Sequence, residues 1–116
     1  MQLTPEIVKA AYEFLIKTPP FNRWKLPQSS DVKFLVAKSD KIYGCFNTYA
    51  DSTKLEIVVS DKTVGHTDLL LATVAHEIIH LYQHIHSKCT KAEHNAHWKK
   101  LAGTVCKHHG WDVKAF

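Results

Sequence analysis

Two histidines and a glutamate lie close together in the sequence in a pattern that could hold a metal ion. The segment His76-Glu77-Ile78-Ile79-His80 spaces two imidazoles four residues apart. On an α-helix these two side chains share one face, so both could reach the same ion. Glu77 would lie about 100° around the helix, where its carboxylate could take a proton from a water on the metal. The spacing therefore predicts the order ligand, base, ligand.

The alternative is that a histidine-rich chain produces this pattern by chance. Nine of the 116 residues are histidine, and a shuffled chain of this composition would contain the pattern about 3% of the time. The context favours a metal, because the surrounding residues Leu70, Val74 and Ile78 predict a buried helix, and ionisable groups in such a helix need partners. We therefore predict a metal site and keep hydrogen-bonded histidines as the alternative.

A catalytic zinc ion usually has three protein ligands and one open position, so a third ligand is needed. His84 lies eight residues after His76, which is about 12 Å along the same helix and too far to share one ion easily. His86 has the third-ligand spacing of metzincins, but that pattern requires glycine where this chain has Gln83. It also requires a later Met-turn, and the only methionine is Met1. Neither histidine is therefore preferred.

The remaining candidates lie in the next segment. Glu93 could bind metal, but it closes a Thr-x-x-Glu capping box that begins at Thr90, which explains it structurally. His94 precedes Trp98 by four residues on the predicted last helix, so it should point toward the core that the first two histidines face. His97, one turn later, is the main rival. The spacing favours His94 and leaves His97 open.

The elements that position these residues follow from turn signals and apolar spacing. Thr4-Pro5-Glu6 is typical of a helix start and predicts a first helix from Pro5 to Lys17. A proline-containing loop follows, in which Phe21, Trp24 and Leu26 can pack on the core. Three β-rich runs come next, at Val32 to Ala37, Lys41 to Tyr49 and Lys54 to Ser60. Because short polar turns separate the runs, we expect a three-stranded antiparallel sheet.

Two further helices complete the predicted architecture. The first runs from Leu69 to His86 after a start at Thr67 and Asp68, and apolar residues on nearly every side predict that it is central and buried. The second follows the capping box at Thr90, and Gly110 ends it. The expected fold class is α+β.

The composition indicates one globular domain over residues 1–116, with 45% hydrophobic and 22% charged residues. No apolar stretch is long enough for a membrane span and no secretory signal is evident, so we expect a cytoplasmic protein without membrane contact. Cys45, Cys89 and Cys106 are scattered without a Cys-x-x-Cys pair, which favours reduced thiols and excludes a cysteine zinc ribbon. The net charge of +4 allows weak association with nucleic acid.

The histidine segments resemble a known family. Ala75-His76-Glu77-Ile78-Ile79-His80, followed after a spacer by His94-Asn95-Ala96-His97-Trp98, is similar to the SprT-like and Spartan-type zinc metalloprotease domain. The strand containing Gly44-Cys45 and the run from Ile57 to Ser60 also resemble it, so the likeness covers nearly the whole chain. The compact form is similar to small phage-encoded or bacterial relatives, which would place a phage-encoded protein in the host cytoplasm.

The resemblance implies a zincin-like single domain that hydrolyses peptide bonds in a protein or peptide substrate. It implies one Zn²⁺ per chain, held by His76, His80 and His94, with Glu77 as the catalytic base and Trp98 as a packing aromatic. Asn95 and His97 depart from the family pattern, which usually has glycine and an acid there.

Two other functions stay open. One is a non-catalytic zinc-binding interaction protein, in which His97, Cys89 or Cys106 would close the site as a fourth ligand. The other is a DNA-associated protease that acts on DNA-bound proteins, and we do not expect the DNA-repair role of Spartan to carry over to this chain. For an oxyanion donor the candidates are His97, Tyr82 and Tyr49.

Overall fold

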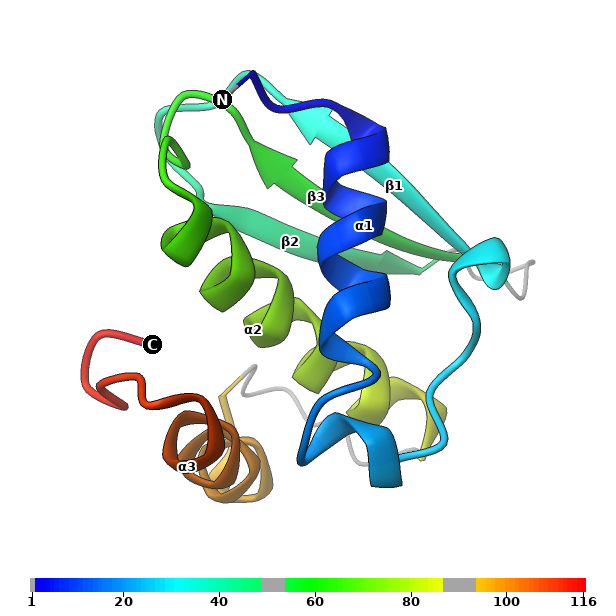
Figure 1. Ribbon diagram of the computed structural model, residues 1–116, viewed down its shortest axis with the longest axis vertical. Helices are drawn as coiled ribbons and strands as arrows, with labels where there is room; N and C mark the ends of the chain where they lie inside the picture. The colour runs from blue at the N-terminus through cyan, green and yellow to red at the C-terminus, as the bar shows by residue number, and fades with distance from the viewer. Residues whose placement is uncertain (1, 49–53, 87–93) are drawn as a thin grey trace.

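The computed structural model describes residues 2–48, 54–86 and 94–116. These residues form an α+β fold with three α-helices and three strands (Figure 1). In chain order the elements are α1 (Pro5–Leu15), β1 (Val32–Ala37), β2 (Gly44–Thr48), β3 (Leu55–Ser60), α2 (Thr67–Ile85) and α3 (Ala96–His109), with short 3-10 turns at Phe21–Arg23 and Ser29–Asp31. The predicted α+β class is confirmed.

The first helix begins where its sequence predicts and ends two residues early. The Thr4 hydroxyl oxygen accepts a hydrogen bond from the Ile7 backbone N–H at 3.3 Å, and Pro5 takes the first helical position. The helix ends at Leu15 instead of Lys17, because the backbone N–H and the hydroxyl of Thr18 both donate to the Leu15 carbonyl, at 2.9 and 2.7 Å. These two bonds occupy the Leu15 carbonyl oxygen, which in a longer helix would accept a hydrogen bond from a backbone N–H of the next turn.

The sheet is mixed, so the predicted antiparallel arrangement is wrong. The strand order is β1-β3-β2, with β3 parallel to β1 and antiparallel to β2. The short polar turns suggested that each strand pairs with the next, but β3 lies between the other two. It is the most deeply buried strand, with Glu56 to Ser60 all buried, and the central place satisfies its backbone groups on both sides.

The second strand is shorter than expected and lies at an edge of the sheet. It covers Gly44–Thr48 instead of the predicted run from Lys41 to Tyr49, of which Tyr49 lies outside the described residues. Because β2 pairs only with β3 in the described sheet, it is an edge strand of that sheet.

The helices form two layers on the sheet. α1 and α2 lie against one face of it, and α3 packs on α2 away from the strands (Figure 1). Side chains of β3, α1 and α2 make the core between them, including Ile57, Val59, Tyr12 and Ile78, all fully buried. Phe21 of the proline-containing loop is also buried, and Trp24 and Leu26 pack on the same core as predicted.

The two helices that follow the sheet differ in how well the sequence predicts their starts. α2 begins at Thr67 and is central and buried, as expected. In the described part of the chain, no helix is long and apolar enough to cross a membrane. α3 begins at Ala96 with Asn95 as its N-cap, so His94 precedes this helix instead of lying on it. The capping box predicted at Thr90 lies outside the described residues. Gly110 ends α3 with a positive φ of 76°, a conformation that favours glycine.

Candidate metal centre

Three histidines converge between α2 and the start of α3. His76 and His80 lie one turn apart on α2, and His94 lies two residues before α3. One ring nitrogen from each of the three lies within 4.8 Å of the others, and the Nε2 atoms of His76 and His94 are 3.1 Å apart. Two nitrogens bound to one tetrahedral zinc ion lie about 3.3 Å apart. The three imidazoles are thus close enough to bind one metal ion, and nitrogen donors suit zinc.

A tryptophan holds the three rings together. The indole of Trp98, in the first turn of α3, has its ring centre 4.6, 5.4 and 4.3 Å from those of His76, His80 and His94. Trp98 is only 6% exposed, so this contact also fixes α3 against α2. The predicted packing role of Trp98 agrees with this geometry.

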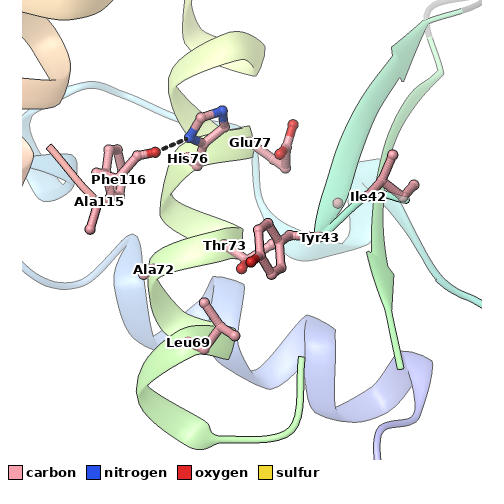
Figure 2. A pocket seen from close by; sticks show the side chains of 10 residues that line it. Ile42, Tyr43, Leu69, Ala72, Thr73, His76, Glu77, Ala115 and Phe116 are labelled. Carbon is pink, nitrogen blue, oxygen red and sulfur yellow. Dashed lines mark hydrogen bonds between the residues drawn. The ribbon is translucent and has the colours of Figure 1, made fainter. Parts of the chain in front are cut away.

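The second ring nitrogen of His76 meets the last residue of the chain. Its Nδ1 atom lies 3.1 Å from the backbone oxygen of Phe116 (Figure 2). Because that oxygen can only accept, Nδ1 is the donor, and in the neutral ring the lone pair is then on Nε2, which lies 3.1 Å from Nε2 of His94. The Phe116 ring stacks on Trp111 and Trp98, which anchors this contact. No sequence signal identifies Phe116, since any residue has a backbone oxygen.

Burial prepares His80 for a metal. Desolvation by burial and, in second place, the nearby His94 together lower the pKa of its imidazole to about 4. Only the neutral imidazole can donate a lone pair to a metal ion. The site therefore favours the form of His80 that binds metal, at neutral pH and in mild acid.

A buried glutamine contacts His97. Gln83, 1% exposed on α2, donates from Nε2 to the Asn95 side-chain oxygen at 3.0 Å and lies 3.0 Å from Nδ1 of His97. The same Asn95 oxygen accepts from the Trp98 backbone N–H at 2.8 Å, which caps α3. Among the described residues His97 is outside the converging group. The role of Gln83 was missed, although a glutamine on so apolar a helix signals a buried partner.

The other predicted candidates lie apart from the three histidines. His84 is exposed with its ring centre 5.8 Å from that of Phe46, and His86 is exposed against Tyr82. Cys45 is half-buried and Cys106 is buried. In the part of the chain that the structure describes, none of these belongs to the group of converging ligand atoms. Glu93, Cys89 and Tyr49 lie outside the described residues.

Glu77 lies beside this group, 5% exposed and close to the backbone of β2. A Cβ atom added at Gly44 would lie 3.6 Å from Oε2 of Glu77, but only 2.6 Å from the Val58 carbonyl oxygen and 2.9 Å from Cγ2 of Thr73. Gly44 is therefore needed for β2 to pass this close to α2. The pKa of the Cys45 thiol is raised by burial and, in second place, by the charge of Glu77. A glycine inside a β-rich run is the available signal for such a contact.

A cleft of about 530 Å³ is lined by residues of β2 and α2 and by the three histidines. Its walls are β2 residues on one side and, on the other, side chains of α2 together with His94. The residues that line it are Gly44, Cys45, Phe46, Asn47, Thr48, His76, Glu77, His80, Gln83, His84 and His94. All three histidines and Glu77 therefore line one cavity beside β2.

These features define an α+β protein with a three-histidine cluster, able to hold a metal ion, on and beside its central helix. The sequence profile of the SprT-like family matches residues 17–115, which is most of the chain. The chain therefore belongs to the SprT-like family, as its histidine segments indicate. Comparison with curated proteins gave no match, and comparison with solved structures gave none.

Proposed function

We propose that this protein is a zinc-dependent peptidase. The observation that carries the proposal is the cleft beside β2, which His76, His80, His94 and Glu77 all line. Membership of the SprT-like family supports the same function. Three nitrogen ligands leave a fourth tetrahedral position for water or substrate, which is the arrangement of catalytic zinc sites.

The three histidines would hold the metal, and Glu77 would move protons. A bound zinc ion supplies a Lewis acid that lowers the pKa of a water and polarises a carbonyl. Glu77 accepts the proton of the attacking water and returns it to the leaving amine, since its carboxylate opens into the same cleft. Phe116 and Trp98 keep His76 oriented during these steps.

The edge strand suggests how a peptide reaches the site. Gly44–Thr48 line the cleft and β2 is at the edge of the described sheet, so an extended substrate can pair with its backbone. Main-chain pairing would place a peptide carbonyl beside Glu77 without requiring one particular side chain. We therefore propose a protein or peptide as the substrate.

The main alternative is a zinc site with a purely structural role. Such a site normally has four protein ligands, whereas the converging group contains three among the described residues. This number of ligands favours an enzyme.

The decisive experiment compares Glu77→Gln with the wild type. We expect the variant to keep its zinc, measured by mass spectrometry, and to lose at least about 100-fold in turnover of an unfolded protein substrate. Glu13→Gln is the matched control, because this glutamate lies on α1 and accepts a hydrogen bond from Ser29 far from the cleft. Wild-type turnover by the Glu77→Gln variant would contradict the proposed mechanism.

A further inference from the structure

A second cavity, shown in Figure 2, adjoins the cleft that the three histidines line, and Glu77 lines both. It measures about 310 Å³, and its walls come from Ile42 and Tyr43 before β2, Leu69, Ala72 and Thr73 on α2, and Phe116. We call it the side-chain pocket. We propose that it receives one apolar side chain of the substrate, carried by a residue next to the cleaved peptide bond. This inference rests on the proposed peptidase function and adds a substrate preference to it.

The position of the pocket ties it to the reaction. Gly44, His76 and Glu77 line both the side-chain pocket and the cleft that contains the histidine cluster. A peptide whose carbonyl lies between His76 and Glu77 thus has neighbouring atoms at the mouth of the pocket. Because successive side chains of an extended chain point to opposite sides, one flanking side chain enters while the next points away.

The chemistry of the walls selects the kind of side chain. Leu69 and Ala72 form one wall, and Ile42 and the ring of Tyr43 form the facing one (Figure 2). Among the described residues that line the pocket there is no lysine, arginine or aspartate, so Glu77 is its only charged side chain, apart from the ring of His76. A basic side chain would have to pair with Glu77 and would occupy the proposed base. An apolar side chain leaves Glu77 free.

The size of the pocket and the exposure of its rim agree with a single apolar occupant. At about 310 Å³ it is at the small end of ligand cavities, which suits one side chain. Ile42 and Tyr43 are 37% and 59% exposed, and they are consecutive residues beside the same opening. Single exposed apolar residues are ordinary, but a bound side chain would cover these two together.

A binding experiment tests the pocket without requiring turnover. Zinc-loaded protein is titrated by calorimetry with acetohydroxamate and with 4-methylpentanohydroxamate, which share a metal-binding head and differ in an apolar tail. If the tail enters the pocket, the second compound should bind about 10- to 100-fold more tightly. Equal affinity of the two compounds would overturn the inference.

Two pocket variants and one control variant locate the effect. Ala72→Leu adds volume inside the pocket and should remove most of the difference between the compounds, with acetohydroxamate still bound. Ala10→Leu makes the same change at an exposed position of α1 and should leave the difference intact. Tyr43→Ser removes apolar surface at the exposed rim without disturbing the core, so it should also reduce the difference. A full difference in both pocket variants would overturn the inference.

Cleavage of a peptide library separates this inference from the proposed function. We expect leucine, isoleucine, methionine or phenylalanine to be enriched at one position flanking the cleaved bond, and Ala72→Leu to shift that position toward alanine and glycine. Cleavage without apolar enrichment, or with enrichment of lysine or arginine, would overturn the inference and leave the peptidase function standing. Absence of cleavage by the wild type would instead contradict the peptidase function, and the hydroxamate comparison would still decide the preference of the pocket.

Discussion

The Nδ1 atom of His76 lies 3.1 Å from the backbone oxygen of Phe116, 40 residues further along the chain. Hydrogen bonds of this kind orient a histidine so that its other nitrogen faces a metal, and their loss typically weakens metal binding 10- to 100-fold. Deleting residue 116 should therefore weaken zinc binding by about 10- to 100-fold. Competition with a zinc chelator of known affinity measures the change.

Val113→Ala provides the control for this first prediction. Val113 is 53% exposed in the same C-terminal segment, and its side chain is not among those that line the pocket or contact the three histidines in the structure. This variant should bind zinc as tightly as the wild type. Equal zinc affinity of the wild type and the variant without Phe116 would show that the hydrogen bond does not position His76.

Replacing the competing histidines one at a time tests the third ligand. His94→Ala should lose the metal, because Nε2 of His94 lies 3.1 Å from that of His76. His97→Ala should retain it, because the imidazole of His97 lies against Gln83 instead. Zinc content is measured by mass spectrometry after purification without chelator. Loss of zinc only in His97→Ala would move the third ligand from His94 to His97.

Gly44 should be among the positions most sensitive to an added methyl group. In Gly44→Ala the new Cβ would meet the Val58 carbonyl oxygen at 2.6 Å, so β2 must shift away from β3 or α2. We expect a loss of about 1–3 kcal/mol in the free energy of unfolding, measured in urea. Gly103→Ala is the matched control, since a Cβ there meets nothing within 4 Å and alanine favours the helix by about 0.5–1 kcal/mol. A Gly44→Ala variant as stable as the wild type would contradict this close packing.

The stability of the metal-free protein should fall as the pH drops below about 6.5, in part through His109. Burial lowers the pKa of this imidazole in the folded state, as does the neighbouring His108, while a hydrogen bond with the Pro19 backbone acts in the opposite direction. The unfolded chain therefore takes up the proton at a higher pH than the folded chain does. Neutral His109 therefore stabilises the fold at pH values above the pKa that it has in the unfolded chain. This contribution is lost as the pH falls toward the lower pKa that His109 has in the folded chain.

Urea unfolding at pH 7 and pH 5, with a metal chelator present, measures this effect. Replacing His109 with glutamine removes the titrating group, so the variant should lose less stability between the two pH values than the wild type. An equal loss in both proteins would show that His109 does not contribute to the acid sensitivity.

The sequence by itself determined the features that depend on neighbouring residues. Thr4 and Pro5 start α1, Gly110 ends α3, and apolar residues on nearly every side make α2 a buried helix. The placement of His76 and His80 on one face of α2 follows in the same way, because four residues make about one helical turn. Capping and helical period act within a few residues of sequence, so their outcome can be predicted without knowing the rest of the fold.

Only the tertiary structure decided which distant segments meet. It placed β3 between β1 and β2, brought His94 to the two helical histidines, turned His97 toward Gln83, and set Phe116 against His76. Each of these contacts depends on the packing of several elements at once. Burial of β3 and of Trp98, for example, fixes the places of residues that are far from them in the sequence. The physical reason is that backbone and side-chain partners separated by many residues leave no periodic or local pattern in the sequence.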